Sequence, residues 1–478
     1  MTAAKHDPVR RPRVSLVATA RPTFAVDVAQ QRAEQARALL VELGADVLGP
    51  STLVMTPEDL TAAAELIDLD ADLVVNLSAS FSDASPALAL YGGIDRPVLL
   101  WSVREPGPVG DRLWLNSMCG VNLFGHALAL AGTPVRTLHG DPDEPAVREA
   151  LTRAIHGDLP PAPALPTEQR ARGGGDVAKQ ALASLRGRRI GVVGDAPTGF
   201  TPSEYDPDVL REMFGVEVER LEIEEAFSAA RSQLGETVAT EVADAVSQRP
   251  TLADLDPDKV ALSAAVTSTL RGWSATNVLS AIAVRCWPEF PGDLGVCPCT
   301  ALSRLADEGT ATTCERDVHG ALTMLLLESL GSGTTYLVDT VDLDAEAGIV
   351  RLWHCGSAAT SLAAGGSEAA TQDVHCNRKI GVTGNFALRT GPVVMARLTE
   401  DPAGASPLRL LIAAGESVPE PNRFMGNTAA VRLDSDAETF VRALATGGFP
   451  HHTVLAWTDV RPQLRTAADL LAIPVTEF

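Results

Sequence analysis

Two strand-like runs decide the fold of this chain: Arg13-Val14-Ser15-Leu16-Val17-Ala18 and, much later, Arg189-Ile190-Gly191-Val192-Val193-Gly194. Each has the length and apolar character of a buried strand. After the first run, residues 27–43 carry small and apolar side chains at helical spacing and end at Gly44. Further strand-like runs follow at 72–77 and 97–101. This alternation predicts a parallel sheet with helices on its faces.

The second run predicts a second unit of the same kind. A break in composition separates the two units, because Pro160-Pro161-Ala162-Pro163 and Gly173-Gly174-Gly175 frame a polar stretch that suits neither helix nor strand. We therefore predict an α/β fold with two tandem Rossmann-like domains, the first at 1–165 and the second at 188–330. A linker, 166–187, joins them.

From Gly331 onward the helical patterns thin out, and strand-like segments become common at 336–341, 349–353, 393–398 and 408–413. These segments predict a mostly β C-terminal domain at 331–478. A chain of 478 residues is too long for one core, so two to four domains are expected on length as well.

Composition narrows the class of protein. A formal net charge of −22 argues against nucleic acid and anionic membranes as partners. The chain has no apolar run of about 18 to 20 residues, and its start lacks the apolar core of a signal peptide, so a cytoplasmic location is expected. The seven cysteines are odd in number and lack Cys-x-x-Cys pairs, which favours reduced thiols over a zinc site.

Three segments supply candidate ligands for an oxygen-rich divalent metal site. They are Cys314-Glu315-Arg316-Asp317-Val318-His319-Gly320-Ala321, Thr334-Thr335-Tyr336-Leu337-Val338-Asp339 and Gly447-Gly448-Phe449-Pro450-His451-His452-Thr453. Two carboxylates and an imidazole on separate elements suit such a site.

Each candidate also has a simpler explanation. With Thr312 or Thr313 as N-cap, Glu315 and Asp317 fall in the first turn of a helix, where acids also merely complement the helix dipole. Asp339 lies mid-strand among apolar residues and needs a partner, which a metal ion, a buried arginine or backbone amides would supply.

The paired histidines follow Pro450, which makes their approach extended. On a strand, the two rings point to opposite faces, so one of them is expected to enter the site.

The order Glu315, Asp339, His451-His452 resembles the C-terminal half of L-fucose isomerase, and Gly-Gly-Phe-Pro-His-His-Thr-Val is similar to Gly-Gly-Ala-His-His-Thr-Val of L-arabinose isomerase. Weaker likenesses lie at 76–82, 194–200 and 388–393. The chain thus resembles the L-fucose/L-arabinose isomerase superfamily, and the L-fucose isomerase-like branch more closely. The resemblance implies the same three-domain fold.

The resemblance also implies roles for individual residues. Glu315, Asp339 and His452 correspond to metal ligands, and Glu315 and Asp339 to the acid/base pair. Mn²⁺ is the expected cofactor, since hard carboxylates outnumber the imidazole. His451 is a further candidate for substrate contact.

Two positions need separate treatment. His354 falls where L-arabinose isomerases supply another histidine ligand, while Val338 replaces their second glutamate, so His354 is expected as an optional ligand or an orienting hydrogen-bond partner. Ala20-Arg21-Pro22 looks like an Ile-Arg-Pro element that contacts substrate in a neighbouring subunit. That likeness implies a homo-oligomer with shared sites, although a surface arginine is the alternative.

These features predict a metal-dependent aldose-ketose isomerase. Its substrate stays open between L-fucose, an arabinose and an anionic sugar such as sulfoquinovose. A non-catalytic sugar-binding protein is the alternative from another class, because tandem Rossmann-like lobes also form such proteins. A nucleotide enzyme is disfavoured, since Gly194-x-x-x-x-Gly199 lacks the phosphate-loop ending and the Gly-x-Gly-x-x-Gly spacing.

Overall fold

The computed structural model describes residues 10–166 and 173–478. Its first domain is a five-stranded parallel sheet in the order β2-β1-β3-β4-β5, with helices on both faces. This is the order of the smaller doubly wound folds. The strands are β1 (Arg13–Thr19), β2 (Asp46–Leu48), β3 (Leu73–Ser78), β4 (Val98–Ser102) and β5 (Val135–His139). The helices are α1 (Val26–Glu42), α2 (Pro57–Leu66), α3 (Ser85–Tyr91), α4 (Ser117–Leu130) and α5 (Pro145–Ala154).

The second domain holds a four-stranded parallel sheet in the order β7-β6-β8-β9. Its strands are β6 (Arg189–Val193), β7 (Glu217–Leu221), β8 (Leu279–Val284) and β9 (Ala311–Thr313). Its helices are α6 (Gly175–Leu185), α7 (Pro207–Phe214), α8 (Ile223–Ser232), α9 (Glu236–Gln248), α10 (Pro257–Asn277), α11 (Cys299–Asp307) and α12 (Val318–Ser329). Both predicted Rossmann-like units are therefore present.

Helix α6 corrects one expectation, because it occupies residues that were predicted as linker. Ala178, Ala181 and Leu185 recur at helical spacing and are buried in the same hydrophobic cluster as α12. The stretch described as neither helix nor strand ends at Gly175, and tertiary packing of its apolar side makes the following part of the predicted linker a helix. The described part of the predicted linker, 173–187, is thus largely helical.

The C-terminal domain is built on a mostly antiparallel sheet, as predicted. Six of its described strands close into a ring in the order β17-β11-β10-β18-β15-β16, since β17 also pairs with β16. These strands are β10 (Tyr336–Asp344), β11 (Ile349–His354), β15 (Gly391–Glu400), β16 (Leu408–Val418), β17 (Asn427–Leu433) and β18 (His452–Ala456). Short strands β12 (Gln372–Asp373), β13 (Thr383–Gly384), β14 (Phe386–Ala387) and β19 (Val475–Glu477), with helices α13 (Ala437–Thr446) and α14 (Arg461–Leu470), complete it.

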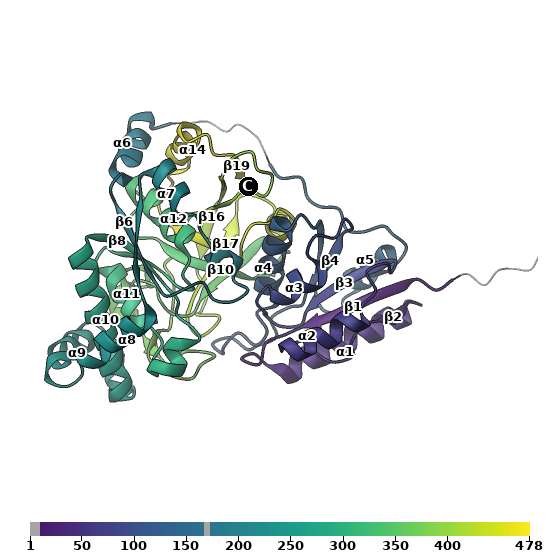
Figure 1. Cartoon of the computed structure of the whole chain (residues 1–478), viewed down its shortest axis with the longest axis horizontal. Coiled ribbons are helices and arrows are strands. Elements are labelled where there is room, and N and C mark those ends of the chain that lie inside the picture. The colour runs from purple at the N-terminus through teal and green to yellow at the C-terminus, as the bar shows by residue number, and fades with distance from the viewer. Residues whose placement is uncertain (1–9, 167–172) are drawn as a thin grey trace, which may run out of the picture.

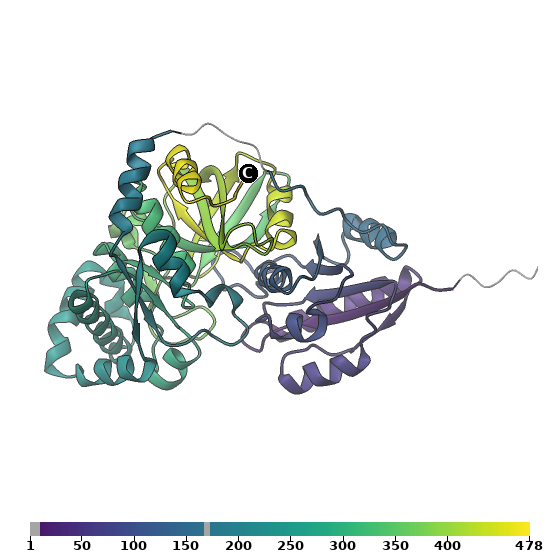
Figure 2. The ribbon, with the colours of Figure 1, turned by 45° about the horizontal axis from the view of Figure 1, so that its top comes forward.

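The closed ring of six strands forms a barrel, and this barrel joins the two α/β domains (Figure 1). Figure 2 shows the yellow-green C-terminal sheet above the gap between the purple and teal lobes. One buried cluster combines Ile190 of β6, Leu325 of α12 and Ile412 of β16. A second combines Leu113 of the first domain with Val284 of β8 and Trp353 of β11. Side chains from all three domains therefore meet around one region. In the part of the chain described, helices of membrane-spanning length and apolarity are absent.

Candidate active site

One pocket lies where the three domains meet, and it contains about 710 Å³ of open space. Its wall includes Arg21 from the first domain, Glu315 from the second, and Asp339, His354 and His451 from the C-terminal domain. His452 lies directly behind this wall, against Glu315 and Asp339. A single chain thus brings together all six residues that were singled out from the sequence.

Three potential ligand atoms converge at the inner end of the pocket. The Nε2 atom of His452 lies 3.3 Å from Glu315 Oε2 and 3.3 Å from Asp339 Oδ1. His452 and Asp339 are buried, Glu315 is partly buried, and Asp339 Oδ1 has no hydrogen-bond donor among the described residues. Two carboxylates and one imidazole this close together need a positive charge between them. The geometry and the donor set therefore fit a divalent cation with oxygen-rich ligation.

The backbone around Glu315 differs from the prediction. Thr312 and Thr313 belong to strand β9, and helix α12 begins only at Val318, so Glu315 lies in the connecting turn and not in the helix. Its φ angle is +58°, in the left-handed region. The turn presents the carboxylate to the pocket, where the indole nitrogen of Trp287 donates to Glu315 Oε1 at 3.2 Å.

Asp317 supports the site from behind and was underestimated from the sequence. It is the N-cap of α12, where it accepts the Gly320 N–H at 2.7 Å, and it also pairs with Arg397. Its Oδ2 atom lies 2.8 Å from Nδ1 of His452. A carboxylate on the far nitrogen of a histidine fixes the tautomer that leaves Nε2 free to bind a cation. A second acid two residues after Glu315 was the available signal, but only the fold shows that it contacts His452.

Both histidines of the pair reach the site, which corrects the expectation that only one would. Strand β18 begins at His452, so His451 precedes the regular alternation of side chains. The two ring centres are 4.0 Å apart, and His451 Nε2 lies 3.4 Å from Glu315 Oε2. Phe81 and Phe200 flank the His451 ring.

His354 is oriented as a hydrogen-bond donor. Its Nδ1 atom accepts the backbone N–H of Cys355 at 2.9 Å, so the ring proton of the neutral form resides on Nε2. That Nε2 atom is buried without a partner and belongs to a close group with Asp339 and His452. An N–H at this position suits a hydrogen bond to a substrate oxygen better than a bond to a metal ion.

Burial and mutual charges shift the pKa values of these groups in the metal-free protein. Burial works against ionisation of Glu315, but His451 and His452 outweigh it and hold the Glu315 pKa well below its usual range. Burial raises the pKa of Asp339 to about 7, against the opposing charge of His452. Burial favours neutral His452, yet the carboxylates of Asp317 and Glu315 prevail and raise its pKa to about 10. The inner end of the pocket therefore holds one shared positive charge among several acids.

Arg21 lies in the pocket of its own chain, whereas the resemblance had placed it in a neighbouring subunit's site. Its guanidinium carbon is 4.2 Å from the centre of the Trp287 ring, on the indole whose nitrogen reaches Glu315. Its backbone N–H donates to Ser80 Oγ at 3.0 Å. The loop after β1 is thereby tied to the loop after β3, at the carboxyl edge of the first sheet where ligands bind in such folds.

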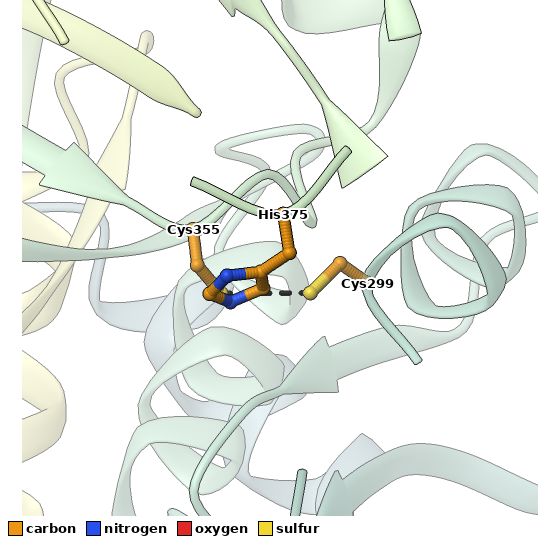
Figure 3. A group of neighbouring side chains, drawn as sticks. All are labelled: Cys299, Cys355 and His375. Atoms are coloured by element: carbon orange, nitrogen blue, oxygen red, sulfur yellow. Dashed lines mark hydrogen bonds between the residues drawn. The ribbon is translucent and has the colours of Figure 1, made fainter. Parts of the chain in front are cut away.

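Thiols line another side of the pocket. Cys299 and Cys355 approach each other to 3.6 Å between sulfur atoms, with the His375 ring beside them (Figure 3). His375 Nδ1 accepts the backbone N–H groups of Asn377 and Arg378, each at 3.2 Å, so its Nε2 carries the proton. Such a ring donates and does not ligate, which argues against a soft-metal centre here. All seven cysteines are buried and unpaired.

The fold and the site define a class: a three-domain protein whose pocket brings together two carboxylates and neighbouring histidines, a set of groups suited to aldose-ketose isomerisation. The family model "L-fucose isomerase, C-terminal domain" matches residues 352–478. Curated sulfoquinovose isomerases from Alkalicoccus urumqiensis and Priestia aryabhattai are 36% and 32% identical to the chain, over 96% and 94% of its length and 98% and 96% of theirs. One from a Clostridium strain is 31% identical over 95% of the chain and 96% of its own length. The chain therefore belongs to the L-fucose isomerase-like family of sugar isomerases and is an enzyme, not a non-catalytic sugar-binding protein.

Proposed function

We propose that this enzyme isomerises sulfoquinovose, a hexose with a sulfonate on its sixth carbon, to the corresponding 2-ketose. The observation that carries the proposal is nearly full-length similarity to sulfoquinovose isomerases, combined with a pocket that has acids and histidines at its inner end. Neutral aldoses such as L-fucose and L-arabinose are the alternative substrates, and the anionic sugar is favoured because the pocket wall also includes Arg21 and Arg378.

Manganese is the proposed cofactor, held by Glu315, Asp339 and His452. Carboxylates that outnumber a single imidazole suit a hard ion with open coordination positions. When bound, such an ion polarises the first and second oxygens of the sugar. His354 donates a hydrogen bond to a sugar oxygen through its Nε2–H, and His451 stands beside Glu315 on the substrate side.

The proton transfers fall to Glu315 and Asp339. An aldose-ketose isomerisation moves one proton between the first two carbons and another between their oxygens. Asp339 lies in the pocket wall beside the proposed cation site, where its carboxylate is suited to accept a proton and return it. Glu315, held ionised by its neighbours, is suited to act as the base. Phe81 and Trp287 give the pocket wall an apolar part next to Glu315, and Phe200 packs behind both rings.

A direct assay tests the proposal. Protein stripped with EDTA and reloaded with Mn²⁺, with Zn²⁺ or with no metal is incubated with sulfoquinovose, glucose, L-fucose and L-arabinose, and ketose is measured by NMR. We expect ketose from sulfoquinovose, most rapidly with Mn²⁺ and none without metal. Turnover of a neutral aldose but not of sulfoquinovose would contradict the proposed substrate. Full activity after complete metal removal would contradict the proposed manganese cofactor.

Glu315→Gln provides the matching variant. It keeps the side-chain volume but removes a base and a ligand, so kcat should fall by about 10² to 10⁴. Glu204→Gln, an exposed residue on a nearby loop, serves as the control and should keep the wild-type rate. Circular dichroism verifies that both variants are folded.

We also propose a homo-oligomer that works in the cytoplasm, on the strength of the family resemblance. Sedimentation and cell fractionation test these two statements separately from the chemistry.

A further inference from the structure

Two guanidinium groups face the pocket without a carboxylate partner. Arg21 and Arg378 both line it, and among the described residues neither forms an ion pair. Asp83 and Glu315 are the acids whose charge reaches Arg21, but Asp83 accepts the Ser85 N–H at 3.0 Å and Glu315 interacts with the histidines. Arginines such as Arg316 and Arg409 also lack an ion pair among the described residues, but they donate to backbone carbonyls, and others pair with acids. Arg285, for example, pairs with Glu289, and Arg351 pairs with Asp342.

The two positive groups influence each other. Burial and then the charge of Arg378 lower the pKa of Arg21. Like charges in one partly buried pocket repel, and within the described ranges 10–166 and 173–478 no acid lies within ion-pair distance of either group. An arrangement of this kind is stabilised when an anion enters and accepts hydrogen bonds from both groups.

The loops that carry the two arginines are held in place before any ligand arrives. Arg378 follows a loop in which His375 Nδ1 accepts the N–H groups of Asn377 and Arg378. One nitrogen of Arg112 donates to Asn377 Oδ1 at 3.3 Å and to the Thr23 carbonyl at 2.9 Å. Arg112 thus connects the loop that carries Arg378 with the loop that carries Arg21. Preorganisation of this kind reduces the entropy lost on binding.

Arg21 lies near the acids at the inner end of the pocket. Its guanidinium packs on the Trp287 ring, whose nitrogen donates to Glu315. A sugar whose first two oxygens meet Glu315 and Asp339 leaves its remaining carbons to the pocket wall, which also contains Arg21 and Arg378.

We propose that Arg21 and Arg378 form the subsite for the anionic substituent on the sixth carbon of the sugar. This inference rests on the proposed function and names the residues that distinguish an anionic from a neutral aldose. A sulfonate and a phosphate share the recognised chemistry, a tetrahedral group with charged oxygens. Arginine binds such oxygens through two N–H groups at once, which lysine does not reproduce.

The test compares kcat/KM for sulfoquinovose, glucose 6-phosphate and glucose in wild type, Arg21→Met, Arg378→Met and Arg378→Lys. We expect each methionine variant to lower kcat/KM for sulfoquinovose by about 10- to 100-fold, mainly through KM, and to reduce the preference for sulfoquinovose over glucose by a similar factor. Arg378→Lys should fall between wild type and Arg378→Met. A higher kcat/KM for glucose 6-phosphate than for sulfoquinovose would still support the subsite, but with phosphate and not sulfonate as the anion that it binds.

Two controls match the variants. Lys379→Met removes the same charge one residue away, from an exposed side chain outside the pocket wall. Arg389→Met removes an arginine that stacks on Trp457 as Arg21 does on Trp287, but at a distance from the pocket. For both variants, kcat/KM for sulfoquinovose should stay within about threefold of the wild-type value, since substitutions away from a binding site or a packed core usually have small effects.

Calorimetric binding of sulfoquinovose to Glu315→Gln separates this inference from the proposed function. Suppose that the wild type yields no ketose, and that binding of sulfoquinovose is lost when Arg378→Met is added to Glu315→Gln. That result would support the subsite and contradict sulfoquinovose as the substrate of the isomerisation. Unchanged preference in both methionine variants, or a wild type that treats glucose and sulfoquinovose alike, would overturn the subsite.

Discussion

At the scale of single residues, the site depends on two consecutive left-handed positions. Glu315 and Arg316 both have φ angles of +58°, which costs of order 1 to 3 kcal/mol for side chains of this kind. The surrounding contacts offset that cost, because the Ser203 hydroxyl donates to the Glu315 carbonyl and Arg316 donates to the Ser203 carbonyl at 3.2 Å. The strained turn between β9 and α12 is what aims the Glu315 carboxylate at His452.

Asp317 is a positioning residue whose loss should affect both stability and metal binding. Asp317→Asn leaves Arg397 without its buried counter-charge and weakens the hold on His452. We expect the free energy of unfolding to drop by about 3 kcal/mol and Mn²⁺ affinity to fall by about 10- to 100-fold. Urea denaturation and a metal titration measure the two effects.

Asp436→Asn is the control for that prediction. Asp436 is also an N-cap aspartate, accepting the Thr439 N–H at 2.8 Å, but it is exposed and has no site contact. Asparagine caps helices about as well as aspartate, so little change is expected. If the two variants lost equal free energy of unfolding and equal Mn²⁺ affinity, Asp317 would act only as a helix cap and not as a positioning residue for His452.

Metal binding should depend on pH because protons compete for the same atoms. Below pH 7 Asp339 is protonated in the metal-free protein, and His452, with a pKa of about 10, carries a proton throughout the neutral range. We therefore expect the apparent dissociation constant for Mn²⁺ to rise at least tenfold for each pH unit below 7. Isothermal titration in several buffers also counts the protons released. A constant that does not vary between pH 5.5 and 8 would contradict this.

The same shifts predict the stability of the metal-free protein. Both pKa values are raised, so the folded state binds more protons than the unfolded chain, and stability is lost as pH rises through them. Between pH 6.5 and 8.5 the Tm of the metal-free protein should fall, and loading with Mn²⁺ should reduce that slope.

At the scale of elements, strand register decides the ligand geometry. Asp339 on β10 lies opposite His452 on β18 and opposite Trp353 on β11. Directly opposed residues project to the same face of a sheet, so this pairing brings the carboxylate and the imidazole together. A slip by one residue would send Asp339 to the other face.

Helix α4 carries the first domain to the barrel by close approach. A Cβ added at Gly125 would collide with backbone atoms of Ala445 in α13. We expect Gly125→Ala to destabilise the protein by about 1 to 3 kcal/mol, because the two helix backbones must separate. Thermal denaturation provides the measurement.

Gly272→Ala is the matched control for this prediction. Gly272 lies within helix α10 with open space around its Cα. Alanine there should stabilise the protein by up to about 1 kcal/mol. Equal loss of stability in the two variants would remove the packing argument.

At the scale of the whole molecule, the pocket exists only because three domains meet around it. Arg21 comes from the first, Glu315 from the second, and Asp339 and His452 from the third, all within one chain. Because the chain as a whole carries a formal charge of −22, the two arginines in the pocket wall would attract the proposed anionic sugar only locally.

Subunit mixing tests whether one chain suffices. Because Arg21 lies in the pocket of its own chain, co-refolded Arg21→Ala and Glu315→Gln chains should recover no more activity than either variant alone. Activity well above both would show that a neighbouring subunit supplies Arg21. Mixing each variant with wild type controls for exchange of subunits.

The sequence by itself determined the local and chemical parts of this protein. Apolar runs such as 189–194 predicted the strands, since burial of alternating or continuous apolar residues depends on nearby sequence. Asp339 stood out because a carboxylate among apolar residues needs a partner. Glu315 and His452 were assigned as ligands through the resemblance to the isomerase superfamily.

Only the tertiary structure decided what joins these parts. Four features depend on contacts between distant segments: the helix at 175–185, the left-handed turn at Glu315, the hydrogen bond between Asp317 and His452, and the entry of both histidines. So does the approach of Arg378 to Arg21, which lie 357 positions apart (378 − 21 = 357). Such contacts form when the three domains pack together. Local sequence propensity does not predict them, because the free energy that selects them comes from burial across the whole chain.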